Sequence, residues 1–271
     1  MRALPEPVPA SPMPPPSLPT TNLAPMIVFG LVFQGLAAGP YTFAAAAWMC
    51  LLPLLVLVRA LPLVPAIAAS FVIPLVGRGA TLALVPVEAG GGFENAVGIA
   101  AATSVMLLCH RVVMRELPLV GALAAPCAVV VVEYAFGAWS LPGAMLLPLS
   151  STQAGDVLFM RFVDVLTPLG ISFGVAWGQS TMAGFGEAWI APDPYSQAER
   201  ERGLRVGANL CFWILIVLFH GGGLLRDAPT ATPTHHVVVF GVCCAALVAM
   251  LASAVVTHVR RPAPTPVPAA A

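Results

Sequence analysis

The sequence contains no lysine, and charged residues make up only 9% of the chain. A water-soluble domain of 271 residues needs several times more charge to cover its surface. This shortage of charge, with a mean hydropathy of +0.91, excludes an ordinary soluble globular protein and indicates an integral membrane protein. The formal net charge is zero, which argues against a nucleic-acid-binding protein, because such proteins carry excess positive charge.

The sequence also lacks the cysteine spacing of a zinc site or of a disulfide framework. Six cysteines lie in or beside apolar segments, without a Cys-x-x-Cys pair, and we interpret them as small apolar side chains. His220, His235, His236 and Asp227 offer metal ligands in principle, but adjacent side chains such as His235 and His236 diverge. We therefore expect no metal and no cofactor.

Proline defines the two ends of the chain. The first 24 residues hold eight prolines and no apolar core, so this stretch does not resemble a cleaved signal peptide. We expect a disordered Pro-rich tail over residues 1–25, a transmembrane helical domain over 26–258, and a disordered Pro/Ala tail over 259–271.

Long apolar runs fill the region between these tails. A helix needs about 20 apolar residues to cross the hydrocarbon layer, and the runs predict an all-α, polytopic transmembrane bundle of about eight spans. The first two would form a hairpin around Gly39 and Pro40, with a short first arm. The expected spans are Met26–Ala38, Tyr41–Val58, Leu61–Gly77, Ala96–Cys109, Leu117–Phe136, Phe162–Glu187, Val206–Leu225 and Val237–His258.

Arginine predicts the orientation of the bundle, because basic residues beside spans stay on the cytoplasmic side. With the spans above, nine of the twelve arginines fall on one face, which also holds both termini. We expect both termini to be cytoplasmic. The stretch Leu224–Gly241 then lies on the other face, as the connection between the last two spans.

The apolar segment Trp139–Met160 lies on that non-cytoplasmic face. Pro142, Gly143, Pro148 and Gly155 interrupt it, so we expect it to lie in the interface or to enter the membrane partway. Two interpretations stay open at this point: the segment holds a lipid tail, or it covers the bundle.

Three stretches resemble the membrane domain of bacterial apolipoprotein N-acyltransferase. Gly35–Arg59 is similar to its opening hairpin, with Trp48 and Pro53 matching. Glu133 and Tyr134 resemble an acidic-aromatic pair at the outer end of its fifth span. In the third stretch, the matching residues are Asp164, Gly170, Ser172 and Phe173.

The chain also departs from this family. Arg161, Thr167 and Gln179 stand where the family usually has glutamine, glycine and asparagine. The family inserts a nitrilase-like domain between its last two spans, where a Glu-Lys-Cys triad transfers an acyl chain from phospholipid to lipoprotein. This chain has only a short connection there and no lysine, so we expect no catalytic residue and no activity from it alone.

The resemblance implies a protein of the bacterial inner (cytoplasmic) membrane, with phospholipid as its partner, together with lipoprotein and a separate nitrilase-like subunit if the enzyme is split. The candidate residues for lipid or substrate contact are Glu133, Tyr134, Trp139, Gln153 and Asp164. Simpler roles exist for three of them: Asp164 can pair with Arg161 one helical turn away, and Tyr134 and Trp139 can anchor at the interface.

A small-molecule transporter or channel is the alternative function. Transporters of this kind show inverted internal repeats and intramembrane charges that face one another, and the sequence shows neither clearly. A membrane anchor for a signalling protein is less well supported, because the Pro/Ala tail has no pattern of an output domain.

Overall fold

The computed structural model describes residues 20–37, 44–86, 92–142, 149–150, 157–190, 207 and 233–260. That part of the chain is all helical, without a strand. The helices are α1 (Thr20–Leu36), α2 (Ala44–Ala47), α3 (Leu52–Ala60), α4 (Leu63–Leu82), α5 (Phe93–Glu116), α6 (Pro118–Gly121), α7 (Ala124–Ala138), α8 (Val157–Ile190) and α10 (Pro233–Arg260). The predicted all-α class is therefore confirmed.

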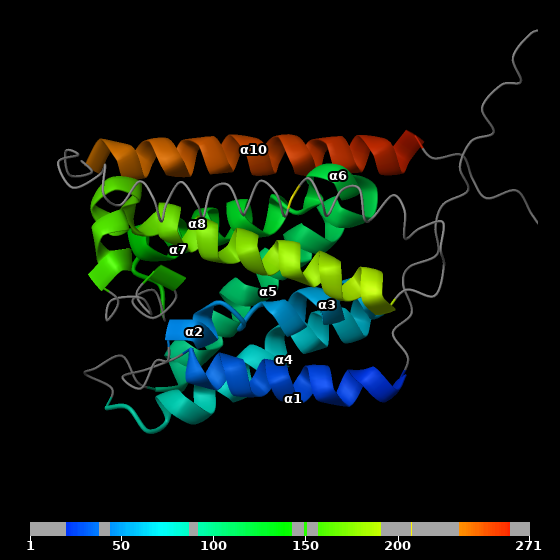
Figure 1. Cartoon of the computed structure of the whole chain (residues 1–271), viewed down its shortest axis with the longest axis horizontal. Helices are drawn as coiled ribbons and strands as arrows, with labels where there is room; N and C mark the ends of the chain where they lie inside the picture. Colours follow the sequence, from blue (N-terminus) through cyan, green and yellow to red (C-terminus); the bar gives the residue numbers. More distant parts are fainter. Residues whose placement is uncertain are drawn as a thin grey trace, which may run out of the picture.

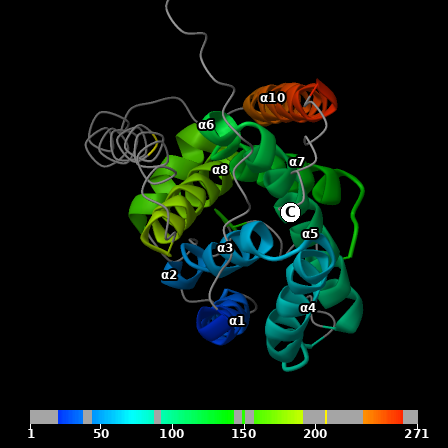
Figure 2. The ribbon, with the colours of Figure 1, turned by 90° about the vertical axis from the view of Figure 1, so that its right-hand side faces the viewer.

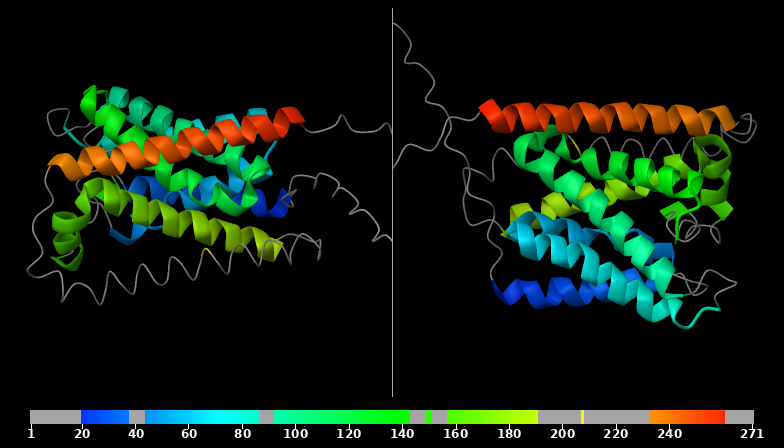
Figure 3. Two further views of the ribbon diagram at one scale, coloured as in Figure 1. Left: turned by 90° about the horizontal axis from the view of Figure 1, so that it is seen from above. Right: turned by 180° about the vertical axis from the view of Figure 1, so that it is seen from behind.

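The long helices form a bundle, and the start of α1 and the end of α10 lie at the same end of it (Figure 1). Viewed end-on, α3 lies at the centre, where it contacts α1, α4, α5 and α8 (Figure 2). The helix α10 runs along the outside of the bundle (Figure 3) and packs mainly on α7 and α5. The short helix α3 is thus surrounded by longer ones.

Three of the described helical stretches are long and apolar enough to cross a membrane: Leu63–Leu82, Phe93–Glu116 and His235–Arg260. They correspond to three predicted spans, although each helix extends beyond its predicted bounds. The apolar parts of α1 and α7 are shorter than a complete span. The structure therefore supports a membrane protein with transmembrane helices, and the count of eight remains a prediction.

The predicted span Tyr41–Val58 is wrong as a single helix. The helix is interrupted between α2 and α3, where Trp48–Leu51 form turns and bends. Pro53 lies in the first turn of α3, where its missing N–H does no harm, whereas in a continuous helix the ring would clash with the preceding turn. Pro53, a local feature of the sequence, therefore favours a new helix at α3 over one continuous helix.

Two more predicted spans are interrupted. Leu117–Phe136 is divided into α6 and α7 by a turn at Ala122 and Leu123. Phe162–Glu187 lies within α8, but Thr167 is non-helical with φ 67° and ψ 159°. Pro168 accounts for the loss of helical conformation at Thr167, since the helical region is disfavoured before proline, but not for its positive φ.

The helix ends also differ from the predicted boundaries. The helix α1 begins at Thr20, inside the predicted tail 1–25, and α10 continues to Arg260, inside the predicted tail 259–271. At its other end α10 begins at Pro233, so His235 and His236 belong to its first turns and not to the connection before it. The predicted span Val206–Leu225, apart from Gly207, lies outside the described residues.

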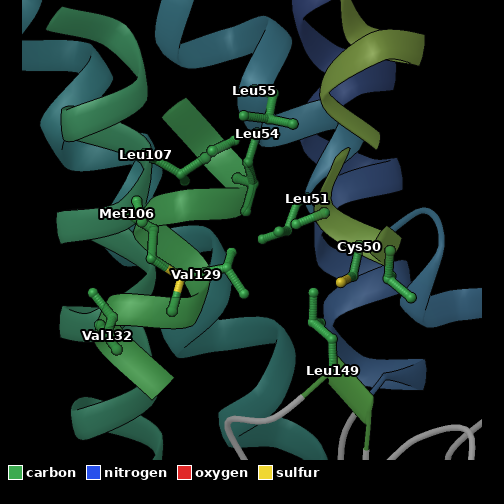
Figure 4. Close-up of a cluster of buried hydrophobic side chains, with 14 of the residues drawn as sticks. Cys50, Leu51, Leu54, Leu55, Met106, Leu107, Val129, Val132 and Leu149 are labelled. Atoms are coloured by element: carbon green, nitrogen blue, oxygen red, sulfur yellow. The ribbon is translucent and has the colours of Figure 1, made fainter. Parts of the chain in front are cut away.

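One continuous apolar core fills the bundle. Side chains from the α3 region, α5 and α7 point toward one another, and Leu149 reaches them from the segment that follows α7 (Figure 4). Leu54, Leu55 and Leu57 of α3 are fully buried, which accounts for the central place of this short helix. Full burial of a leucine stabilises the fold by roughly 1.5–3 kcal/mol.

Candidate functional site: a buried polar cluster

Two glutamines satisfy the backbone groups that the break between α2 and α3 leaves free. Gln179 of α8 accepts hydrogen bonds from the backbone N–H groups of Leu51 (2.6 Å) and Leu52 (3.2 Å), and its amide donates to the carbonyl of Ala47 (2.8 Å). Gln34 of α1 donates to the carbonyl of Cys50 at 2.9 Å. A break inside a membrane bundle requires such partners, because no water is available there.

Arg78 continues this network into α4. Its side chain is only 3% exposed, and its Nε donates to the Oε1 of Gln34 at 2.8 Å. The thiol of Cys50 lies beside the guanidinium and interacts with it. A charged side chain in the apolar interior is costly, so its presence marks this region as a candidate functional site.

Glu133 of α7 is the second charged residue of the cluster. Its side chain is 5% exposed, and its Oε1 accepts a hydrogen bond from the N–H of Leu149 at 3.0 Å. Among the described residues, no group bonds to its buried Oε2 with normal hydrogen-bond geometry. The guanidinium of Arg78 and the hydroxyl of Ser172 are the polar groups that act on this carboxyl. Glu133 thus keeps one oxygen available to a donor.

Leu149 and Ser150 belong to the segment predicted to lie at the interface or to enter the membrane partway. Both are buried, at 3% and 6% exposed, and the N–H of Ser150 donates to the hydroxyl of Ser172 at 3.1 Å. The backbone carbonyl of Pro142 packs so closely on Gly98 of α5 that a methyl group there would lie 2.0 Å from it. These parts of the segment therefore fold into the bundle.

The five predicted contact residues have different surroundings. Tyr134 stacks on Phe240 of α10, with ring centroids 4.1 Å apart, and so helps to hold α10 on α7. Trp139 is 73% exposed just beyond the end of α7, a place suited to an interfacial anchor. Asp164 lies on α8, where only its backbone is described, and Gln153 lies outside the described residues. Among the three of these residues whose side chains the structure describes, Glu133 is the one that joins the buried cluster.

The sequence interpretation missed the three other polar side chains of the cluster. Arg78 and Gln34 received no role, and Gln179 was noted only as a departure from the family pattern. Each interrupts an apolar run, which is the signal that could have found them. The sequence also shows no clear pair of facing charges, whereas the structure brings Arg78 and Glu133 close enough to attract each other.

The cluster places the thiol of Cys50, the guanidinium of Arg78 and the carboxyl of Glu133 near one another. Cys50 is fully buried, and its thiol donates a hydrogen bond to the carbonyl of Ala47 at 3.4 Å. No group of three described His, Cys, Asp or Glu side chains is placed to hold a metal ion, and His220 and Asp227 lie outside the described residues.

Gln34, Arg78 and Glu133 each lie near the C-terminal end of their helix, and these three ends lie at the same end of the bundle (Figure 1). The candidate site is therefore a buried polar cluster at the end opposite to the start of α1. Comparison of the chain with protein-family models, with curated proteins and with solved structures finds no match.

Proposed function

We propose that this chain is an eight-span protein of the bacterial inner membrane, with both termini cytoplasmic, that binds phospholipid or lipoprotein without catalysing acyl transfer by itself. In this proposal it is a bundle of the apolipoprotein N-acyltransferase type without the nitrilase-like domain. Its binding site is the polar cluster, which lies toward the non-cytoplasmic end. A separate nitrilase-like subunit would complete a split enzyme.

The observation that carries this proposal is the environment of Glu133. Its carboxyl is buried at one end of the bundle, accepts a hydrogen bond from the N–H of Leu149 at one oxygen, and has no hydrogen-bond partner of normal geometry among the described residues at the other. The amino group of a lipoprotein or of a phospholipid headgroup is a donor that this oxygen would accept. The exposed Trp139 lies at the same end, where headgroups meet the protein.

Lipid retention by variant proteins tests the site. We expect the Glu133→Gln protein, purified in mild detergent, to retain amine-bearing phospholipid or a lipoprotein peptide several-fold less than the parent in native mass spectra, because an amide cannot become a carboxylate acceptor for the bound ammonium group. Glu94→Gln is the matched control, since Glu94 is an exposed carboxylate at the same end of the bundle. Equal loss in both variants, or loss in neither, would contradict the proposed site.

The absence of catalysis has its own test. The purified chain, supplied with phospholipid and a diacylated lipoprotein, should transfer no acyl chain, because it has no lysine to complete the triad. Transfer that appears only after a nitrilase-like subunit is added would support a split enzyme. Efficient transfer by the chain alone would overturn the non-catalytic assignment.

A transporter is the second candidate, and the structure offers specific support for it. Helices broken at Trp48–Leu51 and at Thr167, together with the interacting charges of Arg78 and Glu133, are features that secondary transporters use at their substrate sites. Uptake of a labelled solute into proteoliposomes that is abolished by Glu133→Gln, without any change in lipid retention, would favour this function.

A further inference from the structure

The outer helix α10 packs on the bundle along one face, mainly against α7 and α5 (Figure 3). Val242 and Val248 of this helix are 64% and 61% exposed, whereas Cys243 and Leu247 are 5% and 7% exposed. The contacts of the packed face therefore decide how firmly α10 is held on the other helices.

Two cysteines meet in this contact. Cys127 of α7 is 4% exposed, and its side chain shares a hydrogen bond with that of Cys243 of α10. Both thiols are free, so no bond joins the two sulfur atoms in this structure. Thiols that share a hydrogen bond have their sulfur atoms in contact, and a disulfide requires side chains that face each other in this way.

A second contact holds the register that brings the two thiols together. Tyr134, two turns after Cys127 on α7, stacks on Phe240, one turn before Cys243 on α10, with ring centroids 4.1 Å apart. The fully buried Ala128 belongs to the same core as both cysteines, and small residues of this kind let membrane helices approach closely. The thiol pair therefore lies on a close and fixed seam between α7 and α10.

The surroundings of the pair favour a disulfide over a metal ion. A metal would require thiolates and further ligands, and no group of three described His, Cys, Asp or Glu side chains is placed to supply them. Two thiolates would also place charge in the apolar core that contains both cysteines, whereas a disulfide carries none. Because the pair is buried, the active site of an oxidising protein cannot reach it, but a small apolar reagent can.

We propose that Cys127 and Cys243 are a reversible redox site, which a small apolar disulfide dissolved in the membrane oxidises to one disulfide that ties α10 to α7. The sulfur of one cysteine attacks a sulfur of the reagent, the S–S bond of the reagent breaks, and half of the reagent leaves with the proton of that cysteine. The second cysteine then attacks the first at the mixed disulfide, and the other half leaves with the second proton. Two cysteine thiols are oxidised and one reagent disulfide is reduced to two thiols.

Peptide mapping tests whether this bond forms. The chain has no lysine, so trypsin cuts after arginine, which places Cys127 in the peptide 116–161 and Cys243, with Cys244, in the peptide 227–260. The full chain is reduced in mild detergent, freed of reductant, treated with dithiodipyridine, alkylated and digested. We expect these two peptides to be joined in the monomer and to separate when dithiothreitol is added.

Three variants identify the cysteines that form the bond. Cys127→Ala and Cys243→Ala should each lose the joined peptides, whereas Cys244→Ala should keep them, since Cys244 is the neighbouring, partly exposed cysteine. The absence of joined peptides in the parent would overturn the proposal. Joining through Cys244 in place of Cys243, or joining only between two chains, would overturn it as well.

Thermal unfolding in the same detergent tests whether the bond acts as a tether. The disulfide would close a long loop, so we expect the oxidised parent to unfold about 5–10 °C above the reduced parent. The same treatment should not shift the midpoint of Cys127→Ala, which controls for reaction of the reagent with other thiols. Joined peptides without any rise in the midpoint would show that the bond does not hold α10 in place.

Discussion

At the scale of single residues, Gln179 stabilises the break between α2 and α3 through its side-chain amide. One side-chain amide serves three backbone groups of the break between α2 and α3. If the amide were lost, the N–H of Leu51 would be buried without its partner, whereas the N–H of Leu52 also bonds to the carbonyl of Met49 and the carbonyl of Ala47 also accepts from the thiol of Cys50. An unpaired buried group costs about 1–3 kcal/mol.

We therefore predict that Gln179→Leu lowers the free energy of unfolding by about 1–3 kcal/mol, because the N–H of Leu51 loses its partner, although the leucine adds apolar surface. The midpoint of thermal unfolding in detergent, followed by circular dichroism, measures the change. Met182→Ala is the control, because Met182 lies on the same helix and is 45% exposed. A Leu variant that is as stable as the control would show that other groups satisfy the break.

Glu133 is the one residue of the candidate site that the sequence prediction named, because a carboxylate inside an apolar run stands out more than an amide does. The roles of Gln34, Arg78 and Gln179 could not be predicted from their own positions in the sequence. Their partners lie 16, 44 and 128 residues away in the sequence, and only the packing of α1, α4 and α8 around α3 brings them together. Local patterns do not contain this information.

At the scale of helices, α1 and α4 pack through glycine. A Cβ atom on Gly77 would lie 2.7 Å from the carbonyl of Leu31 and 2.8 Å from the Cβ of Gln34. Helices in membranes rely on such small residues to approach closely. The same contact sets the distance over which Arg78 reaches Gln34.

Gly77→Ala should push α1 away from α4 and destabilise the protein by about 1–3 kcal/mol, as overpacking does elsewhere. Gly79→Ala is a matched control two residues along the same helix, where a Cβ would meet only Ala96 at 3.6 Å, an ordinary contact. Thermal unfolding of both variants in one detergent distinguishes them. Similar midpoints for the two would contradict tight packing at Gly77.

Hydropathy and length predicted the helices that stand alone as spans, namely α4, α5 and α10. The same reasoning failed for Tyr41–Val58 and Leu117–Phe136, since an apolar composition is shared by a continuous helix and by two short helices with a turn. Two factors decide between these arrangements: the position of proline, and hydrogen-bond partners that are remote in the sequence, such as Gln179. Only the position of proline can be seen in the local sequence.

At the scale of the whole molecule, the orientation is open to a direct test. Trp139 lies just beyond α7, and His258 lies in the last turn of α10, at opposite ends of the bundle (Figure 1). Both are exposed, at 73% and 74%, so cysteines placed there should be reachable by a reagent in water.

In a background without the native cysteines, we predict that Trp139→Cys reacts with a membrane-impermeant maleimide added outside spheroplasts, whereas His258→Cys reacts only after permeabilisation. The reason is that arginine-rich ends stay in the cytoplasm. The extent of labelling is read from the shift of the band on a gel. The reverse pattern would invert the proposed topology, and labelling of both from one side would show that this part of the bundle does not span the membrane.

The hydrogen bonds of Gln179 also bear on how the protein is made. A membrane helix enters the bilayer as it leaves the ribosome, and Gln179 is synthesised 128 residues after Leu51, to which it bonds. Until α8 is synthesised, the N–H of Leu51 lacks the partner that it has in the folded bundle, so the packing around the start of α3 is incomplete. The core can therefore be completed only after the second half of the chain has been synthesised. The packing of α8 onto the earlier helices is the step that fixes the final arrangement of the bundle.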